Sequence, residues 1–461
     1  MSALWTSDEI ALATGGVPSA QFEVGGVTFD SREVQPGDLF IAMPGTAHDG
    51  HRFVDGAFAA GASAAIVAQS VNGPHILVDD TFAALRALGR ASRERSRATI
   101  FGVTGSVGKT STKEALYAAL DRNRPGKVHR SVKSYNNHTG VPLSLARMPR
   151  DSDFAIFEMG MNNSGEIRAL TAQVRPHVAL VTAIAPAHIE NLGSEEAIAD
   201  AKAEIFESLE PHGAAIIPND TPHRDRLVRA ARRYAERIIT FGTGDADVHA
   251  VHAVCADGGG SLISAVLLER ELTFTISQRG EHWVSNSLAV LAAVEAVGAD
   301  VGRAGLALAD LSGLKGRGQR HLIPIDGGAL LLIDESYNAN PASMAATLKS
   351  LGHERDVERR IAVLGPMREL GEHSEAMHAS LAPEIVSANI DELVLIGPEM
   401  RPLEHALAGR SGTVRVDDVE QATEALRRIV RPGDAVLVKA SNSVGLAKLV
   451  ESMAKELTCS T

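Results

Sequence analysis

Thr104-Gly105-Ser106-Val107-Gly108-Lys109-Thr110 is the stretch that decides the fold of this chain. It follows the apolar segment 99–104, which we expect to be a strand, and it precedes residues 112–120, which we expect to be a helix. A glycine-rich turn in this context points several backbone N–H groups at a phosphate, and the start of the helix adds its positive dipole end. Lys109 then reaches the terminal phosphates, and the Thr110 hydroxyl ligates Mg²⁺. The stretch therefore predicts a nucleotide-binding loop.

The loop is shorter than the common phosphate-binding pattern, which has four residues between its glycines. Where that pattern has its first glycine this chain has Val103, and the nearest glycine is Gly105. A turn of glycine and serine that merely precedes a lysine-bearing helix is the alternative. The flanking strand and helix favour the nucleotide site.

Segments typical of strands and of helices alternate on both sides of this loop. The alternation predicts an α/β fold with parallel sheets and helices on both faces, and 461 residues are enough for three domains. We expect domains at 1–97, 98–313 and 314–461, with the glycine-rich stretch 312–318 at the second boundary. The expected strands are 27–29, 39–43, 64–68, 99–104, 153–157, 178–183, 214–217, two antiparallel strands within 262–276, then 330–333, 361–364, 393–396 and 435–438. The expected helices are 51–60, 81–95, 112–120, 195–209, 282–297, 341–351, 374–387, 419–429 and 444–456.

The helix expected at 81–95 ends in a run of arginine and serine residues. Such a run suits either a solvated linker between domains or an exposed helix end. We expect the exposed helix end.

The composition narrows the class of protein. Hydrophobic residues make up 44% and charged residues 22%, which is ordinary for globular proteins. A net charge of −12 argues against nucleic acid as a partner, because a phosphate backbone needs a broad basic surface. Cys255 and Cys459 are far apart, so they give no metal spacing and suit a reducing compartment. Residues 1–10 lack a signal-peptide pattern and no apolar stretch has bilayer length, so we expect a cytoplasmic protein without a membrane span, and a monomer.

Glu158 and His188 each follow an apolar segment that we expect to be a strand. Residues just beyond the carboxyl ends of parallel strands collect at one edge of the sheet, where ligands bind. Glu158 offers a hard oxygen to Mg²⁺, and His188 offers a neutral nitrogen. A lone histidine is more often a structural hydrogen-bonding residue, so their shared position beside the loop is what favours a metal site.

Lys202 falls on the same helical stripe as Ile198, Ile205 and Leu209. A lysine on a buried face needs a partner or a shifted pKa, although its stem can also pack while the ammonium reaches water. The functional alternative is a lysine that loses its proton and reacts with carbon dioxide to give a carbamate. The periodicity predicts burial and leaves the carbamate open.

These residues resemble the Mur ligase family of peptidoglycan synthesis, and the resemblance covers essentially the whole chain. The family's own loop has the shortened form found at 104–110. The further motifs that carry the resemblance are Phe29-Asp30-Ser31-Arg32, Pro36-Gly37-Asp38-Leu39-Phe40, Asp49-Gly50-His51, Gly61-Ala62, Tyr135-Asn136-Asn137, Gly140-Val141-Pro142-Leu143, Phe157-Glu158-Met159-Gly160, Ala187-His188, Lys202-Ala203-Glu204-Ile205-Phe206, Gly280-Glu281-His282 with Asn286, and Gly316-Arg317.

The resemblance implies a uridine-nucleotide-binding α/β domain, a central P-loop ATPase domain with a parallel sheet, and a C-terminal Rossmann-like domain. The string Asp334-Glu335-Ser336-Tyr337-Asn338-Ala339-Asn340-Pro341 resembles the dipeptide-adding members of the family, whereas members that add the third amino acid carry Asp-Tyr-Ala-His there. The implied reaction is an ATP-dependent carboxylate–amine ligation that joins D-alanyl-D-alanine to UDP-N-acetylmuramoyl-tripeptide through an acyl phosphate. Since residues of three domains take part, the last domain is expected to close over ATP.

The resemblance also implies a role for each site residue. The catalytic residues would be Lys109, His188 and Lys202. The ATP-binding residues would be Thr104, Gly105, Ser106, Val107, Gly108, Lys109, Thr110, Ser111, His282, Asn286, Arg317 and Asp334. The Mg²⁺ ligands would be Thr110, Glu158, His188 and Lys202 as a carbamate. The peptide and uridine substrates would contact Ser31, Arg32, Asn136, Asn137, Asn338 and Asn340.

Two positions depart from the family pattern. Pro366 stands where the family usually has aspartate, and Ala440 stands where it usually has glycine. Both departures concern contacts in the last domain, and neither touches the loop or the metal site.

Three other functions compete with this interpretation. A phosphotransferase or plain NTPase could use the same loop, but it leaves Lys202 and the string 334–341 unexplained. A silent precursor-binding protein would not need Lys109, Glu158, His188 and Lys202 together. Within the ligases, the alternative is the enzyme that adds the third amino acid.

Overall fold

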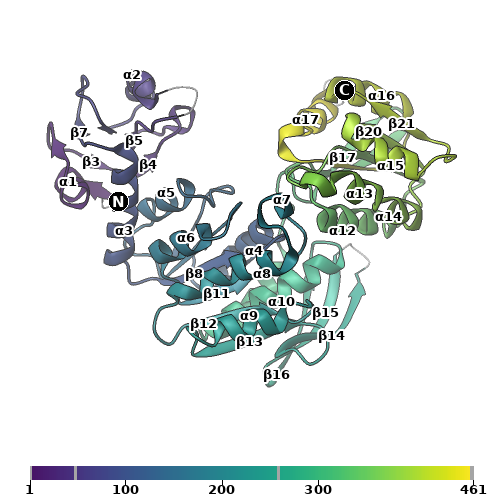
Figure 1. Ribbon diagram of the computed structural model, residues 1–461, viewed down its shortest axis with the longest axis horizontal. Helices are drawn as coiled ribbons and strands as arrows, with labels where there is room; N and C mark the ends of the chain where they lie inside the picture. The colour runs from purple at the N-terminus through teal and green to yellow at the C-terminus, as the bar shows by residue number, and fades with distance from the viewer. Residues whose placement is uncertain (1–2, 46–48, 257–259, 457–461) are drawn as a thin grey trace.

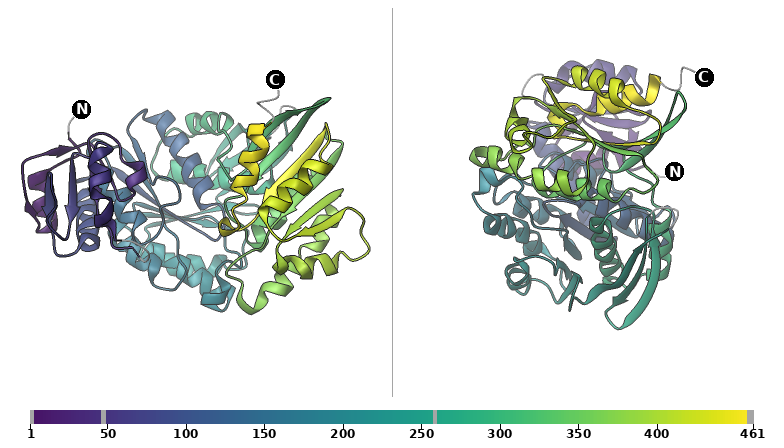
Figure 2. Two further views of the ribbon diagram at one scale, coloured as in Figure 1. Left: turned by 90° about the horizontal axis from the view of Figure 1, so that it is seen from above. Right: turned by 90° about the vertical axis from the view of Figure 1, so that its right-hand side faces the viewer.

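The computed structural model describes residues 3–45, 49–256 and 260–456, and Cys459 lies outside these ranges. Three α/β domains follow one another along the chain, and the two outer domains stand apart on the central one (Figures 1 and 2). Within the described residues, each domain has a main sheet of its own, and a short two-stranded sheet adds to the first. The expected α/β fold with three domains is confirmed.

The central sheet has β8 (Thr99–Thr104) in its middle, between β10 (Phe154–Glu158) and β11 (Val178–Val181). All three strands are parallel and almost fully buried, as continuous apolar runs require when helices cover both faces. Parallel pairing continues through β9 (Val128–Arg130), β12 (Ala214–Pro218), β13 (Arg237–Gly242) and β14 (Val248–Cys255). The sheet ends in two antiparallel strands, β15 (Ser261–Leu267) and β16 (Arg270–Ile276).

Two separate hydrophobic clusters lie on the two faces of the central sheet. The first is formed with α4 (Lys109–Asn123), α10 (Glu281–Ala296) and α11 (Val301–Ala309). The second is formed with α5 (Gly140–Ala146), α6 (Glu166–Val174), α8 (Glu195–Ala203), the 3₁₀ turn η3 (Glu204–Ser208) and α9 (Arg224–Ala231). The sheet is therefore sandwiched, and the loop between β8 and α4 emerges at the carboxyl edge of the strands.

The C-terminal domain repeats this sandwich around the strand order β17-β18-β22-β19-β20-β21. Its antiparallel edge strand β17 (Gln319–Ile325) pairs with β18 (Gly328–Glu335), and the rest are parallel. The remaining strands are β22 (Asp434–Lys439), β19 (Arg359–Leu364), β20 (Glu392–Ile396) and β21 (Thr413–Val416). One face packs on α12 (Pro341–Gly352), α13 (Ser374–Ala379), α14 (Ala382–Ser387) and α15 (Arg401–Ala406), and the other on α16 (Val419–Ile429) and α17 (Ala447–Glu456).

The N-terminal domain has the smaller sheet order β2-β7-β6-β5-β4. Its strands are β2 (Val17–Pro18), β4 (Gly26–Thr28), β5 (Asp38–Ile41), β6 (Ala64–Val67) and β7 (His75–Leu77). The helices α1 (Ser7–Thr14) and α3 (Thr81–Arg95) cover one face, and α2 (Val54–Ala59) covers the other.

The sequence predictions differ from the structure at helix ends and in several elements that they did not include, among them β9, β13, β14, α5, α6, α9 and α11. α3, β8 and α16 have the predicted bounds. The helix predicted at 112–120 begins earlier, at Lys109, because Gly108 in a left-handed conformation (φ 83°) turns the loop directly into the helix. The helix predicted at 195–209 tightens to 3₁₀ after Ala203, and the one predicted at 374–387 is broken into α13 and α14, where a proline stands in the first turn of the second.

The prediction that the end of α3 is exposed is wrong. Arg93 is 5% exposed, because α3 ends against the central domain. Its guanidinium donates to the carbonyl oxygens of Val174 (2.7 Å) and Arg175 (2.8 Å) and pairs with Glu210 (3.1 Å). The arginine-rich end of the helix therefore docks the first domain on the second.

The central and C-terminal domains share a buried carboxylate. Glu354, which is 3% exposed, pairs with Arg279 of the central domain (2.5 Å) and with Arg320 of β17 (2.7 Å). Arg320 pairs with Glu354 within the C-terminal domain, and Arg279 reaches the same carboxylate from the central domain, so the ion pair between Glu354 and Arg279 joins the two domains. The exact domain boundaries, at 97/98 and 313/314, stay a prediction.

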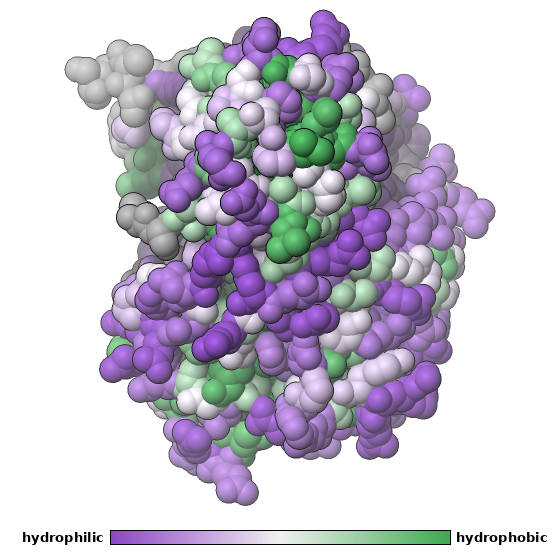
Figure 3. All heavy atoms as spheres, turned by 90° about the vertical axis from the view of Figure 1, so that its left-hand side faces the viewer, coloured by the Kyte–Doolittle hydropathy of each residue, from purple (hydrophilic) through white to green (hydrophobic). Residues whose placement is uncertain are grey.

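On the face drawn in Figure 3, hydrophobic residues form separate patches among hydrophilic ones. No helix in the described ranges has the length and apolarity needed to cross a membrane.

Replacing Arg93 by methionine should lower the free energy of unfolding by about 2–4 kcal/mol, because two buried carbonyl groups and Glu210 lose a charged donor. Urea unfolding monitored by tryptophan fluorescence measures the change, and differential scanning calorimetry provides a second measurement. Arg97→Met is the matched control, since Arg97 is exposed on the segment that follows α3. A loss in Arg93→Met no larger than in this control would contradict the docking role.

Candidate functional site

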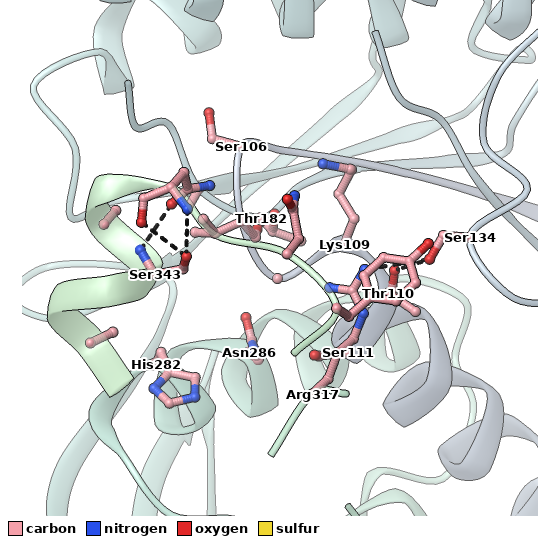
Figure 4. Close-up of a pocket in the computed structure, with 18 of the residues that line it drawn as sticks. Ser106, Lys109, Thr110, Ser111, Ser134, Thr182, His282, Asn286, Arg317 and Ser343 are labelled. Atoms are coloured by element: carbon pink, nitrogen blue, oxygen red, sulfur yellow. Dashed lines mark hydrogen bonds between the residues drawn. The ribbon is translucent and has the colours of Figure 1, made fainter. Parts of the chain in front are cut away.

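A cavity of about 520 Å³ lies between the central and C-terminal domains. The loop 106–111 and the start of α10 line it from the central domain, and residues after β18 and the first turns of α12 line it from the C-terminal domain. Figure 4 shows Lys109 and Thr110 of the loop together with His282 and Asn286 of α10 around this space. The cavity is therefore built at the carboxyl edges of two parallel sheets.

The loop requires glycine at two positions. Gly105 has φ 150°, and a Cβ there would lie 1.9 Å from the Thr182 hydroxyl. Gly108 has φ 83°, and a Cβ there would lie 2.9 Å from the Asn286 side chain. The Thr182 hydroxyl in turn donates to the carbonyl oxygen of Val107 (2.5 Å), so the strand end after β11 fixes the loop. A side chain at Gly105 would therefore collide with Thr182, and one at Gly108 would collide with Asn286.

Lys109 folds back on its own loop and donates to the Gly105 carbonyl oxygen (2.6 Å). Burial lowers the pKa of Lys109, Glu158 opposes this effect, and Arg317 adds to it. Ser106, Val107, Gly108 and Ser111 line the cavity as expected, whereas Thr104 and Gly105 are buried behind it and are not among the described residues that line it.

Glu158, at the end of β10, is the centre of a group of oxygen atoms. Its carboxylate accepts from the Thr110 hydroxyl (2.9 Å) and from the Asn136 amide (2.7 Å). The Ser134 hydroxyl lies 3.1 Å from that of Thr110. These residues line the cavity beside the loop, and a carboxylate with neighbouring hydroxyl groups is a ligand set that suits Mg²⁺.

His188 lines the cavity from the residue before α7 (Ile189–Leu192), and its backbone is left-handed (φ 60°). Its Nδ1 is within ion-pair distance of the Glu369 carboxylate in the C-terminal domain. The angles at this contact do not meet those of a hydrogen bond. Glu369 thus reaches a predicted metal ligand from the opposite domain, and this pair lowers the pKa of Glu369.

Lys202 is buried on α8, as its place on the apolar stripe predicts, with 1% of its surface exposed. Within the described residues the structure gives its ammonium no hydrogen bond or ion pair. Burial lowers its pKa well below the ordinary value, and the Lys109 ammonium lowers it further. Lys202 therefore lies near the loop lysine, but it is not among the described residues that line the cavity.

The residues expected at the nucleotide fall into two groups. His282, Asn286 and Arg317 line the cavity, and burial lowers the pKa of His282, which favours its neutral form. The Arg317 guanidinium lies over the Tyr337 ring (4.2 Å). Asp334, in contrast, is buried beside the cavity, and its carboxylate accepts from the Gly316 N–H (2.9 Å) and from Ser336. Asp334 supports the turn that carries Arg317.

The residues expected at the peptide and uridine substrates are spread over all three domains. Asn136, Asn338 and Asn340 line the cavity. The Asn137 side chain instead caps α5 by accepting from the N–H groups of Thr139 and Gly140. Ser31 and Arg32 lie in the 3₁₀ turn η1 (Ser31–Glu33) of the N-terminal domain, away from the residues that line the cavity.

The structure adds residues that the sequence analysis did not select. Lys439 is the last residue of β22 and donates to Glu335 (3.2 Å) and to the Asn338 carbonyl oxygen (3.0 Å). Thr182 follows β11, so the position of the two residues at or just after the end of a strand was a usable signal. Glu335 and Tyr337 also line the cavity, and the string 334–341 contains both, with Glu335 at the end of β18. Ser134, Ser343 and Asn442 line the cavity as well, but they carry no such signal.

The two departures from the family pattern meet in space. A Cβ on Gly365 would lie 2.7 Å from the Ala440 methyl group, so the missing side chain at Gly365 makes room for Ala440. The Pro366 carbonyl oxygen accepts from the Ser441 N–H (3.1 Å). Neither residue lines the cavity among the described residues.

The arrangement suits phosphoryl transfer. Lys109, Arg317 and Lys439 supply positive charge around one cavity, and the loop N–H groups supply oriented donors. Charge neutralisation and positioning are what this chemistry needs from a protein.

Three family models match the chain. They are the Mur ligase family catalytic domain at residues 23–100, the Mur ligase middle domain at 103–294, and the Mur ligase glutamate ligase domain at 320–442. Together they cover most of all three domains.

Known proteins match along nearly the whole chain. The UDP-N-acetylmuramoyl-tripeptide–D-alanyl-D-alanine ligase of Synechocystis sp. is 36% identical over 95% of this chain and 94% of that relative, and the Bacillus subtilis ligase of the same name is 34% identical over 96% of each. A crystal structure of MurF from Acinetobacter baumannii is 28% identical, has a TM-score of 0.84, and covers 98% of this chain and 99% of that one. The MurF ligase of Thermotoga maritima in complex with ADP is 28% identical, has a TM-score of 0.78, and covers 95% of this chain and 98% of that one. Because these matches extend over all three domains, this chain belongs to the Mur ligase family.

Proposed function

We propose that this protein joins D-alanyl-D-alanine to the terminal carboxylate of UDP-N-acetylmuramoyl-tripeptide and converts ATP to ADP and phosphate. The observation that carries the proposal is the cavity in which the loop 104–110, Glu158 and the string 334–341 meet. The names of the full-length relatives and the ADP complex of the Thermotoga maritima ligase support it. The pentapeptide product is a precursor of peptidoglycan, so the activity serves cell-wall synthesis and, with it, cell shape and division.

The reaction has two steps. An oxygen of the tripeptide carboxylate attacks the γ-phosphorus of ATP, the bond to ADP breaks, and an acyl phosphate forms. The amine of D-alanyl-D-alanine then attacks the acyl carbon, loses a proton, and expels phosphate as the amide bond forms.

Residues of this chain act mainly by holding charge in position. Lys109 leaves the Gly105 carbonyl oxygen to contact the γ-phosphate, and the loop N–H groups hold the other phosphate oxygens. Arg317, which is fixed over Tyr337, approaches the same phosphates from the C-terminal domain. His282 and Asn286 stand where the nucleoside would lie, with Asp334 supporting the turn that carries Arg317.

Thr110 and Glu158 are the residues that fit Mg²⁺, since their oxygen atoms already lie within 2.9 Å of each other at the cavity wall. His188 lines the same cavity and would extend this set. The bound ion would neutralise charge on the transferred phosphoryl group.

Lys202 is the residue that would form a carbamate. Its amine is buried, and its pKa is lowered well below the ordinary value, so the neutral form that reacts with carbon dioxide is favoured. The neutral nitrogen attacks carbon dioxide and releases a proton, which leaves a negatively charged carbamate in place of the amine. The charge of that carboxylate would attract the neighbouring Lys109 ammonium.

The N-terminal domain would bind the uridine nucleotide through Ser31 and Arg32, and Asn136, Asn338 and Asn340 would contact the peptide part. Asn137 would act through the start of α5, which it caps. We also propose a cytoplasmic monomer.

Steady-state release of ADP by the purified protein should require both peptide substrates, because the acyl phosphate formed in the first step is consumed only when the amine attacks it. A coupled assay with ATP and Mg²⁺, omitting each substrate in turn, measures this dependence. Replacing D-alanyl-D-alanine by diaminopimelate or lysine distinguishes the proposed enzyme from the ligase that adds the third amino acid. We expect no product with either of these amines.

Lys109→Ala is the negative control for this assay, and its rate should fall by about 100-fold or more. Lys127→Ala is the matched variant, because Lys127 is half-exposed and pairs with Asp151 at the surface. ADP release without either peptide would instead indicate a plain NTPase.

Lys202→Ala should lose about 100-fold or more of its activity, and short carboxylic acids such as acetate or formate should restore part of it by occupying the vacated space. Carbon-13 NMR of the wild-type protein under labelled carbon dioxide should show a carbamate signal that Lys202→Ala lacks. A folded Lys202→Ala protein that no acid rescues, with no carbamate signal in the wild type, would contradict the carbamate.

A further inference from the structure

Lys113 is a fully buried lysine to which the reaction assigns no task. It lies on α4, one turn after Lys109, and none of its side chain is exposed. Its ammonium donates to the carbonyl oxygens of Ser131 (2.8 Å) and Lys133 (2.5 Å) and pairs with Glu114 (3.0 Å). An ammonium group has three N–H donors, so these three partners satisfy it.

The two carbonyl groups belong to one short segment, residues 131–136, which we name the strap. It runs from the end of β9 to the residues before α5, and Lys133 within it has a left-handed backbone (φ 53°). Such a conformation costs free energy in a residue other than glycine, and the surroundings must hold it. The buried Lys113 ammonium fixes the strap through its hydrogen bonds to the carbonyl groups of Ser131 and Lys133.

The inner side of the strap forms part of the cavity. Ser134 lies beside Thr110, and Asn136 donates to Glu158 (2.7 Å). The Ser131 hydroxyl accepts from the Glu158 N–H (3.3 Å), and the Lys113 ammonium lies 3.9 Å from the Glu158 carboxylate. The orientation of Glu158 therefore depends on the strap.

The outer side of the strap contacts the N-terminal domain. Lys133 forms an ion pair with Glu33, and the Tyr135 hydroxyl lies 3.3 Å from the same carboxylate. Glu33 ends the 3₁₀ turn that carries Ser31 and Arg32. One segment of six residues thus connects the phosphate side of the cavity to the expected uridine-nucleotide side.

We propose that Lys113 is a positioning residue that fixes the strap, and thereby couples the phosphate site around Glu158 to the N-terminal domain through Glu33. The inference rests on the proposed function for the part that concerns the uridine nucleotide. The placement of the strap itself does not depend on the substrate. Lys113 acts through the backbone of residues 131 and 133 and through Glu158, and it does not touch ATP.

Lys113→Met is the first variant, because it keeps the buried stem and removes the charge. Amide hydrogen exchange measured by mass spectrometry should become about tenfold or more faster in peptides that cover 131–136, with the sheet strands unchanged. A lysine that only stabilised the fold would change exchange throughout the domain. Equal exchange in 131–136 of the wild type and the variant would overturn the proposal, whatever the substrates prove to be.

The kinetic readout separates the two sides of the strap. In Lys113→Met, KM for the uridine substrate should rise about tenfold or more and kcat should fall, while KM for ATP should stay within about threefold. Glu33→Gln, which weakens only the outer contact, should raise KM for the uridine substrate and leave kcat within about threefold. An unchanged KM for the uridine substrate in either variant would contradict the coupling.

Two further variants close the test. Lys127→Met should match the wild type in exchange and in kinetics, since Lys127 lies on the segment before β9 at the surface. If Lys113→Met does not fold, Lys113→Gln carries the same measurements, because its amide keeps a donor for one of the two carbonyl groups. Failure of both variants to fold would overturn the proposal, since Lys113 would then be needed for folding itself.

Discussion

Positive charge held out of water is the constraint on which this structure depends. In a chain of net charge −12, Lys109, Lys113, Lys202 and Lys439 gather around one cavity and its walls, and three of them are almost fully buried. A buried ammonium persists only where acceptors satisfy it or where its pKa falls. Lys113 is satisfied by acceptors that include Glu114, and the pKa of Lys202 is lowered by burial. Lys439 shows both effects, since it pairs with Glu335 and burial lowers its pKa. Burying these positive charges is unfavourable in the protein without ligand, but the binding of a polyphosphate requires them.

The parallel sheets make this concentration possible. Four residues that line the cavity lie at the end of a strand or in the segment that follows it: Glu158, Thr182, His188 and Lys439. Residues that are many tens of positions apart in the sequence therefore lie around one cavity. The two domains that share the cavity remain joined through Glu354 and its two arginines. The predicted closure of the last domain over ATP would therefore move Arg317 and Glu369 relative to the loop while this contact serves as a pivot, and that motion stays a prediction.

Much of the fold and part of the site could be predicted from the sequence, and the reasons differ by residue. The loop was readable because its glycines, lysine and threonine are adjacent, and Lys202 was readable because helical periodicity reports burial. The contact of Arg93 with the central domain could not be predicted, because an arginine-rich helix end has the same sequence whether it faces solvent or packs against another domain. Lys113 was missed because two of its three partners are backbone carbonyl groups, which the residue types do not reveal. Asp334 and Asn137 were selected as contacts of the ligands, but their side chains are engaged in supporting a turn and a helix cap, which only coordinates can show. Their contacts with ligands stay predictions.

The central claim is that a carboxylate is activated as an acyl phosphate before the amide bond forms. Oxygen-18 placed in the terminal carboxylate of UDP-N-acetylmuramoyl-tripeptide tests it most directly, with the released phosphate and the pentapeptide analysed by mass spectrometry. In the predicted result, each amide bond formed transfers a single labelled oxygen to inorganic phosphate, and the other remains in the amide carbonyl. Unlabelled phosphate released alongside the pentapeptide would contradict the acyl phosphate, and phosphate released without any pentapeptide would contradict the ligase.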